Sequence, residues 1–177
     1  WLSDVIAGIE WCPDNRMNVV NMSLGASSGS TLLEQACRNA ADAGILLVAA
    51  AGNEGAPVIY PAAYSSVIAV AATDSADRVA SWSNKGPQVE LSAPGVDVRS
   101  TWIGSGYATH SGTSMAAPHV AAVCALLLGR SDPLPPPDPR QVLQATADDL
   151  YSLGRDTTSG FGLVDAEEAV TGAQTLP

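Results

Sequence analysis

Basic residues are scarce in this sequence, and lysine is nearly absent. Lys85 is the single lysine among eight basic residues, which face 18 acidic ones, so the 177-residue chain has a formal net charge of -10. So few cations cannot form a basic patch that neutralises phosphates or docks on an anionic membrane. We therefore expect neither nucleic acids nor acidic lipids as partners.

Long apolar runs are also missing. The longest apolar stretch, Met115–Leu128, is shorter than the roughly 20 residues that a membrane-spanning helix needs. A hydrophobic fraction of 46% with 15% charged residues is nevertheless typical of a folded chain. The chain opens at Trp1 in a predicted amphipathic helix, without the pattern of a secretion signal. We expect one compact domain without a membrane span, whose natural N-terminus is missing.

Cysteine is too rare to form a disulfide framework. Three cysteines cannot all pair, and their spacing fits neither a zinc ribbon nor a redox CxxC motif. Cys124 falls in a helix that is apolar on every side and is expected to be a buried small hydrophobic residue. Cys12 and Cys37 fall on two other predicted helices and could pair if these are neighbours, but free thiols are the preferred expectation.

Helical and strand-like patterns alternate along the chain. Apolar residues repeat at helical spacing from Leu2, and again from Leu32 after a cap at Ser30 or Thr31, while Pro13 and Gly44 end these two helices. Short helices are expected at 140–146 and 164–170, the second capped by Asp165. The predicted strands are 19–22, 45–51, 67–72, 79–82, 89–92 and 98–102. The proline-rich stretch 131–139 is expected to be an extended surface loop.

Two of these strands, 45–51 and 67–72, are uninterrupted apolar runs, as in parallel sheets that are buried on both faces. The later strands follow one another without intervening helices. The pattern predicts an α/β fold of three layers, with a doubly wound, mostly parallel sheet and an antiparallel edge.

The most informative stretch of the sequence is His110–Val123. Ser114 follows a turn of small residues and lies in the first turn of a predicted helix that is apolar on all sides and hence buried. Unsatisfied backbone N–H groups and the positive end of the helix dipole converge there, which suits a nucleophilic hydroxyl. The alternative is that Ser114 or Thr113 merely caps the helix, which is the commoner use of such residues.

Two further segments follow predicted strand ends. The buried strand 45–51 runs into Gly52 and Asn53, and strand 19–22 runs into Ser23, Leu24 and Gly25. α/β proteins bind their ligands at the carboxyl ends of parallel strands, where the Asn53 amide could donate to a developing oxyanion. The alternative for both segments is an ordinary turn.

Taken together and in this order, these segments resemble the subtilisin-like serine proteases, or subtilases. The resemblance runs from Trp1 to Val170 and implies that residues 1–177 are the C-terminal portion of a single subtilisin-like catalytic domain. The residues that carry it are Asn21 to Gly25, Ala49 to Gly55, Tyr60-Pro61, Ser65 to Ala72, Ser81 to Gly86, Ala93-Pro94-Gly95, Gly112 to Ala122 and Gly160 to Ala166.

The resemblance assigns roles to residues at these positions. Ser114 would be the nucleophile that attacks a peptide carbonyl, and its backbone N–H and the Asn53 side chain would form the oxyanion hole. Ser23, Leu24 and Gly25 would bind an extended polypeptide substrate as an added strand and form one wall of the pocket for the side chain before the cut. Ala50, Ala51 and Gly52 would form the opposite wall, and Ile59 would make this apolar pocket shallower.

The aspartate and histidine motifs that the family places upstream of its serine do not occur in this chain. His119 lies about 7.5 Å along the helix from Ser114 and is expected to be structural. His110 is expected to line the leaving-group side of the cleft, and Asp156 follows no predicted strand. A serine without a base is a poor nucleophile, so this chain alone is expected to be nearly inactive.

Two functions remain open at this point. The first is a serine endopeptidase whose aspartate and histidine lie on a missing upstream segment, and the second is an inactive fragment or pseudoprotease that binds extended peptides. The first is preferred because Ser114 and Asn53 are both present. The unpaired edge of strand 19–22 implies a partner, either the missing N-terminal half or a second copy, without which the monomer is expected to aggregate.

The resemblance also raises the question of calcium. The family's principal calcium site draws on the absent half, and a second, weaker cation site would use the Glu90 carboxylate with the Ser65 and Val67 backbone carbonyls. The alternative is a solvated glutamate at position 90. An extracellular location is likewise implied by the resemblance.

Overall fold

The computed structural model describes residues 2–130 and 138–172. Its central sheet has the strand order β1-β2-β3-β4, and all neighbouring strands run parallel. The strands of this sheet are β1 (Val19–Met22), β2 (Leu46–Ala50), β3 (Val67–Thr73) and β4 (Val89–Pro94). The helices are α1 (Leu2–Asp14), α2 (Thr31–Asp42), α3 (Thr113–Leu128), α4 (Pro139–Ala145) and α5 (Ala166–Thr171).

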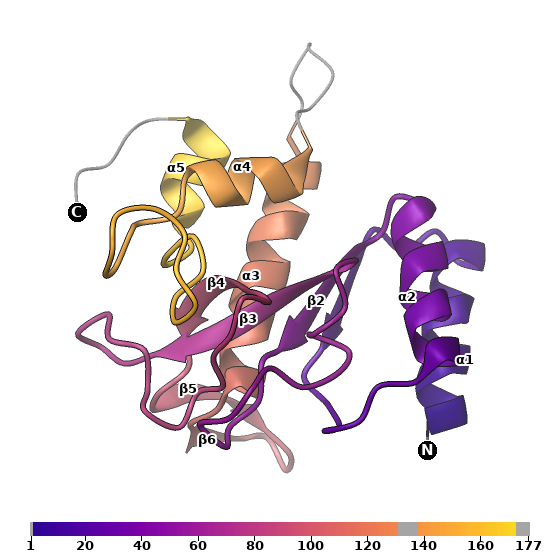
Figure 1. The fold of residues 1–177 in the computed structure, drawn as a ribbon, viewed down its shortest axis with the longest axis horizontal. Helices are drawn as coiled ribbons and strands as arrows, with labels where there is room; N and C mark the ends of the chain where they lie inside the picture. Colours follow the sequence, from indigo (N-terminus) through magenta and orange to yellow (C-terminus); the bar gives the residue numbers. More distant parts are fainter. Residues whose placement is uncertain (1, 131–137, 173–177) are drawn as a thin grey trace.

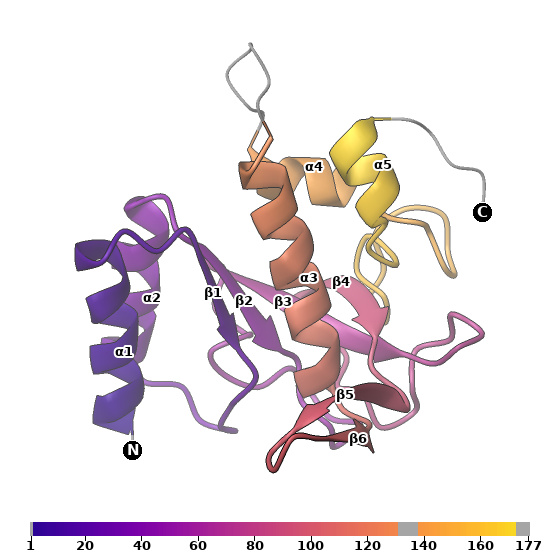
Figure 2. The same ribbon diagram turned by 180° about the vertical axis from the view of Figure 1, so that it is seen from behind.

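The sheet is sandwiched between two helical layers. Helices α1 and α2 cover one face, while α3 covers the other with α4 and α5 beside it (Figures 1 and 2). Successive residues of β2 alternate between these layers: Leu47 and Ala49 belong to the core beneath α1 and α2, and Val48 and Ala50 to the core beneath α3. All seven residues of β3 are buried. The three-layer, doubly wound α/β architecture predicted from the sequence is therefore confirmed.

The predicted antiparallel edge is wrong. The fourth strand of the main sheet, β4, is parallel to β3, and the antiparallel pairing lies in a separate hairpin formed by β5 (Val98–Trp102) and β6 (Gly106–His110). Segment 79–82 is not a strand either. It makes one isolated bridge between Val79 and Thr73 and then turns, with Ser83 N–H donating to the carbonyl of Ala80.

Most helix ends lie where the sequence placed them. Asp165 caps α5 by accepting a hydrogen bond from the Glu168 backbone N–H at 2.8 Å. Helix α2 begins after Ser30, although the Ser30 side chain makes no capping bond. The expected proline-rich loop lies largely outside the described residues; its last residue, Pro139, is the first of α4.

All three cysteines are buried free thiols, so Cys12 and Cys37 do not form a disulfide in this structure. Burial raises the pKa of the Cys124 thiol to about 12. Burial, and secondarily the charge of Glu34, raise the pKa of Cys37 to about 11. Cys124 is fully buried, as expected for a small hydrophobic residue.

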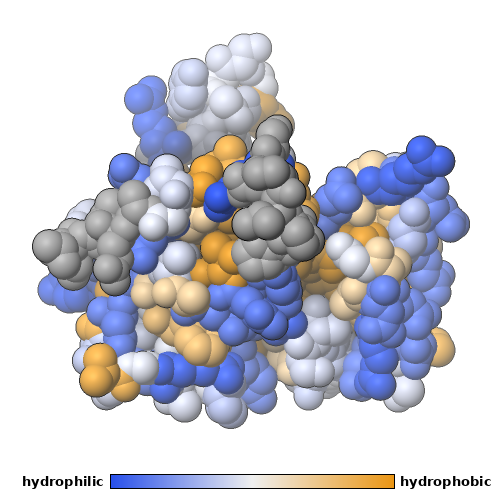
Figure 3. Space-filling view, turned by 90° about the horizontal axis from the view of Figure 1, so that it is seen from above, coloured by the Kyte–Doolittle hydropathy of each residue, from blue (hydrophilic) through white to orange (hydrophobic). Residues whose placement is uncertain are grey.

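The surface is divided between polar and apolar regions. Seen from above, hydrophilic residues cover the side formed by α1 and α2, and apolar residues are visible nearer the middle of the molecule (Figure 3). Strand β1 is an edge of the sheet, and beside it an apolar groove of about 440 Å³ is lined by Asp4, Val5, Gly8, Ile9, Val20, Met22 and Leu24. Within 2–130 and 138–172, none of the helices has the length and apolarity needed to cross a membrane.

Candidate active site

The three segments singled out in the sequence meet at one place. The carboxyl ends of β1 and β2 and the amino end of α3 lie together at the lower side of the sheet in Figure 2. Two reciprocal contacts join the end of β1 to α3: the Ser23 hydroxyl donates to the Ser114 carbonyl at 2.8 Å, and the Ser114 hydroxyl donates to the Ser23 carbonyl at 3.4 Å. Asn21 supports this contact by donating to the Ser23 hydroxyl.

Ser114 is the second residue of α3 and is half-buried. The N-cap position belongs to Gly112, where no side chain makes a capping bond, so the alternative in which Ser114 or Thr113 caps the helix is wrong. In the described part of the chain, no group accepts a hydrogen bond from the Ser114 backbone N–H, as expected in the first helical turn. The hydroxyl and a free N–H donor therefore lie side by side at the positive end of the helix.

Asn53 is held against the start of α3 by its side-chain oxygen. Its Oδ1 accepts hydrogen bonds from the Thr113 backbone N–H at 2.8 Å and from the Thr113 hydroxyl at 3.0 Å. The same hydroxyl accepts from the Gly52 N–H at 3.1 Å, and Thr113 is fully buried. Both donors of the Asn53 amide therefore remain without a partner among the described residues, next to the residue that precedes Ser114.

The two predicted walls of a substrate pocket are joined at one end by Ile59. Its backbone N–H donates to the Ala51 carbonyl at 3.0 Å, and the next residue, Tyr60, pairs with Ala26 in an antiparallel bridge. Ile59 also packs tightly on Gly25, since a Cβ at position 25 would lie 2.4 Å from Ile59 Cδ1. Ala50, Ala51 and Gly52 are buried, whereas Ser23 and Leu24 are exposed. Ile59 thus contacts both segments, through its backbone at Ala51 and through its side chain at Gly25.

Neither histidine is hydrogen-bonded to Ser114 in the part of the chain that the structure describes. His119 Nδ1 lies 2.8 Å from the Met115 carbonyl, one turn earlier in α3. His110 is exposed at the end of β6 and packs against the Trp102 ring, with ring centroids 4.6 Å apart. Asp156 is engaged in its own turn, where it accepts from the Thr158 and Ser159 backbone N–H groups.

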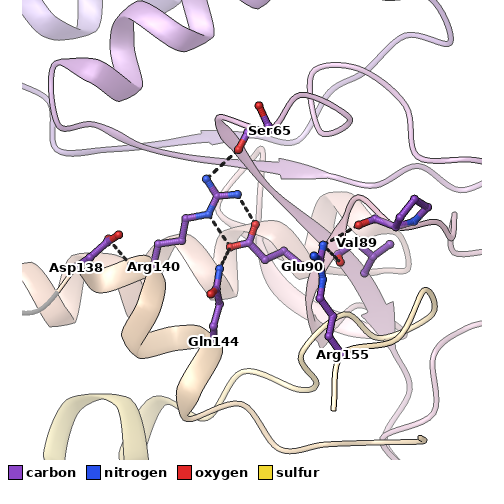
Figure 4. A network of polar contacts seen from close by, with 8 residues as sticks. Ser65, Val89, Glu90, Asp138, Arg140, Gln144 and Arg155 are labelled. Carbon is purple, nitrogen blue, oxygen red and sulfur yellow. Dashed lines mark hydrogen bonds and ion pairs between the residues drawn. The ribbon is translucent and has the colours of Figure 1, made fainter. Parts of the chain in front are cut away.

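The predicted cation site at Glu90 is occupied by an arginine side chain. Arg140 of α4 donates to Oε1 of Glu90 at 2.7 Å and to Oε2 at 2.5 Å, and it also donates to the Ser65 carbonyl at 3.0 Å (Figure 4). Gln144 donates to Glu90 as well. The bonds to Glu90 raise the pKa of the Arg140 guanidinium.

Glu90 is 3% exposed, so its charge needs a bound cation, and the guanidinium supplies it. A calcium ion at this position would have to share the Glu90 oxygens and the Ser65 carbonyl with Arg140. The cation site at Glu90, Ser65 and Val67 stays a prediction. Within 2–130 and 138–172, no group of three or more histidine, cysteine or acidic side chains could hold a metal ion.

Comparison with known proteins identifies the family. The subtilase family model matches residues 1–162. The chain belongs to the subtilase family. It is 51% identical over 169 residues to a thermostable alkaline protease of Halalkalibacterium halodurans, 46% identical to the minor extracellular protease Epr of Bacillus subtilis and 45% identical to subtilisin DY of Bacillus licheniformis. Among solved subtilase-like structures, the S41 psychrophilic protease is 38% identical with a TM-score of 0.84.

The match covers nearly all of this subtilase chain but only part of its relatives. The alignments cover 95%, 96% and 94% of this chain and 46%, 27% and 62% of the three relatives in the order given above. The alignment with this solved structure covers 93% of the present chain and 63% of the solved chain. The subtilase chain therefore spans less than two thirds of each of these proteins.

Sequence reasoning missed three residues that organise this region of the subtilase. Thr113 was considered only as a cap, whereas its hydroxyl joins Gly52 to Asn53. Asn84 is fully buried behind the loop that carries Asn53, and nothing in its neighbourhood in the sequence indicates this. Arg140 could have been found, because a glutamate between Val89 and Leu91 in the predicted strand 89–92 needs a cationic partner when it is buried, and the chain has only eight basic residues.

Proposed function

We propose that this chain is the serine-bearing part of a subtilisin-like endopeptidase, with Ser114 as its nucleophile. The observation that carries the proposal is the junction of Ser114 with an oriented Asn53 at the amino end of α3. In the reaction, Ser114 Oγ forms a bond to the peptide carbonyl carbon while its proton passes to a general base. The Ser114 backbone N–H and the Asn53 amide donate to the oxygen that becomes negatively charged.

The polypeptide substrate would lie as an extended strand along residues 23–25. These residues follow the unpaired edge strand β1, and backbone hydrogen bonds to such an edge are a common mode of peptide recognition. The side chain before the cut would enter between residues 23–25 and 50–52. Because Ile59 packs on Gly25 at the end of this space, we expect small side chains to be preferred there.

We propose that the general base comes from a part of the protein outside this chain, because neither histidine is hydrogen-bonded to Ser114 within residues 2–130 and 138–172. We propose that this part, whether an upstream segment or a second copy, packs on the β1 edge and on the apolar groove beside it. The upstream segment is preferred because the chain spans under two thirds of its relatives. An extracellular location is proposed on the strength of one relative's name, a minor extracellular protease.

A fluorophosphonate probe tests the nucleophile directly. The probe would be incubated with two samples. The first is this chain alone. The second, called the completed protein below, is this chain joined to the part of the H. halodurans relative that lies upstream of the matched region. Mass spectrometry should find the adduct on Ser114 in the completed protein and little or none in the chain alone. Ser114→Ala is the matched control and should abolish labelling.

Comparing the chain alone with the completed protein also distinguishes an endopeptidase from a peptide-binding pseudoprotease. Labelling of Ser114 together with Ser114-dependent cleavage of a peptide supports the endopeptidase. A folded completed protein that binds peptides but shows neither labelling nor cleavage would replace it with the pseudoprotease. Labelling of the chain alone would mean that the base lies within residues 1–177.

A further inference from the structure

We infer that Asn84 is a positioning residue for the oxyanion-binding amide of Asn53. The inference rests on the proposed function, since it concerns how Asn53 is held for that reaction. Asn84 follows a turn after β3 and lies behind the segment 52–56, which is called the Asn53 loop below. It does not approach the reacting atoms itself.

The Asn84 side chain uses its complete hydrogen-bonding capacity on the Asn53 loop and on Pro57, the residue that follows it. Its Oδ1 accepts from the backbone N–H groups of Glu54 and Ala56, both at 2.9 Å. Its Nδ2 donates to the Glu54 carboxylate at 3.1 Å and to the Pro57 carbonyl at 3.0 Å. A side-chain amide has two donors and two acceptor sites, and all four are used here. The amide orientation is therefore fixed.

The Asn84 side chain is buried and lies very close to Gly52. Asn84 is 0% exposed, and its own backbone N–H donates to the Gly52 carbonyl at 2.9 Å. Gly52 has a φ of +112°, and a Cβ at this position would lie 2.1 Å from Asn84 Nδ2. Only glycine tolerates both this conformation and this approach. The Asn84 amide thus occupies the space where a side chain at position 52 would be.

The Glu54 side chain carries this restraint to Asn53. Its Oε2 accepts from Asn84 Nδ2 and, at 2.8 Å, from the Asn53 backbone N–H. On its other side the Asn53 loop is held by Thr113, which bonds Gly52 and Asn53. The loop is therefore clamped between Asn84 and the amino end of α3. Releasing one side should let the Asn53 amide leave the direction in which it donates to the oxyanion.

A purely structural role would also make Asn84 sensitive to mutation, so the test must separate the two roles. A double-mutant cycle does so, since residues that act through one another lose their effects together. In the completed protein, kcat and KM for peptide cleavage would be measured for Asn84→Ala, Asn53→Ala and the double variant, well below each melting temperature. Glu54→Ala is a second variant, which cuts the link at an exposed residue and leaves the core intact. Glu10→Ala, at an exposed glutamate on α1, is its matched control.

We expect Asn84→Ala and Glu54→Ala to lower kcat about tenfold or more with little change in KM, because the loss is confined to the transition state. Asn84→Ala should not lower kcat further in the Asn53→Ala background, and Glu10→Ala should change nothing. If Asn84→Ala lowers kcat by the same factor in both backgrounds, or not at all, the positioning role is refuted.

A second measurement does not depend on activity. In the completed protein carrying Ser114→Ala, the NMR resonances of the Thr113 backbone N–H and the Asn53 side-chain amide should shift on Glu54→Ala and Asn84→Ala. Unchanged resonances would overturn the inference. Absence of Ser114-dependent cleavage in the completed protein would instead overturn the proposed function, and the resonances alone would then decide whether Asn84 positions Asn53.

Discussion

Single side chains determine the shape of the candidate active site. Ile59 illustrates this, because its backbone bonds one wall of the proposed pocket at Ala51 and its side chain lies against Gly25 in the other, where an added Cβ would come within 2.4 Å of Ile59 Cδ1. A pocket that ends in a branched aliphatic side chain has little room for an aromatic or long aliphatic residue of the substrate. The identity of this one residue therefore bears directly on specificity.

We predict that Ile59→Gly changes the preference of the completed protein toward large side chains. The ratio of kcat/KM between two peptide substrates that differ only in phenylalanine or alanine before the cut should rise about tenfold or more, because the space filled by the isoleucine opens. Ile59→Val, which removes one methylene, is the matched control and should shift the ratio far less. An unchanged ratio in Ile59→Gly would mean that Ile59 does not close the pocket.

At the same scale, the proposed roles of Ser114 and Asn53 follow from the resemblance to the subtilases, whereas the residues that support them do not follow from the sequence. By local chemistry alone, a serine and an asparagine at such positions are more commonly a cap and a turn. The structure places Asn53 against Thr113, the residue before Ser114. Thr113 and Asn84 act through contacts over 61 and 30 positions of sequence, respectively. Such contacts depend on tertiary packing, which no local pattern of residues encodes.

At the scale of secondary structure, strands that are buried on both faces were predictable. Strands β2 and β3 are uninterrupted apolar runs, and both lie inside the sheet. Segment 79–82 has similar strand-like residues but lies after the turn at 74–78, where it makes one bridge to the end of β3. Although its residues favour a strand, this segment does not pair along its length with a neighbouring strand and therefore does not become one. The expected antiparallel edge of the main sheet fails for the same reason, since the antiparallel pairing lies between β5 and β6.

Helix α4 is fixed to the sheet by the ion pair between Arg140 and Glu90. Glu90 projects from β4 with a side chain only 5% accessible, and Arg140, at 28%, bonds both of its oxygens and the Ser65 carbonyl. Replacing either partner alone leaves a buried charge without its counterpart, which commonly costs more than the pair itself contributes. The pair therefore ties the start of α4 to β4, while Leu143 of the same helix is buried in the core beside α3.

We predict that Arg140→Met destabilises the fold by about 3–5 kcal/mol, and that Glu90→Gln added to it restores much of the loss. For a chain of this size the single variant should melt on the order of 10 °C lower. Thermal unfolding of the completed protein, followed by circular dichroism, measures both effects. A double variant as unstable as Arg140→Met would show that the unpaired Glu90 charge is not the cause.

At the scale of the whole molecule, the net charge of -10 makes carboxylates repel one another. Asp148 is the clearest case. Burial raises its pKa, and the charges of Asp165, Glu168 and Asp77 raise it further. A carboxyl whose pKa is higher in the folded than in the unfolded state opposes folding while it is ionised. Stability is therefore gained as the pH falls through the folded-state pKa of Asp148, and the penalty is fully present at neutral pH.

We predict that Asp148→Asn raises the melting temperature at pH 7 by about 1–2 °C, a small effect because solvent screens a partly exposed group. The gain should shrink in 1 M salt, where the repulsion is screened, and should vanish near pH 3, where Asp148 is already neutral. Melting curves at both pH values and both salt concentrations are the measurement. An equal gain at pH 3 and pH 7 would point to packing rather than charge.

The burial of every thiol has a practical consequence for work on the whole molecule. Cys12, Cys37 and Cys124 are all inside the fold, and the pKa of each is raised by burial. Thiol reagents attack the thiolate, and burial disfavours this form at all three positions, most strongly at Cys37 and Cys124. A cysteine introduced at an exposed position, for example on the β5–β6 hairpin, would therefore be the one fast-reacting thiol of the described chain. Fluorescent or spin labels could then be attached there without first removing the native cysteines.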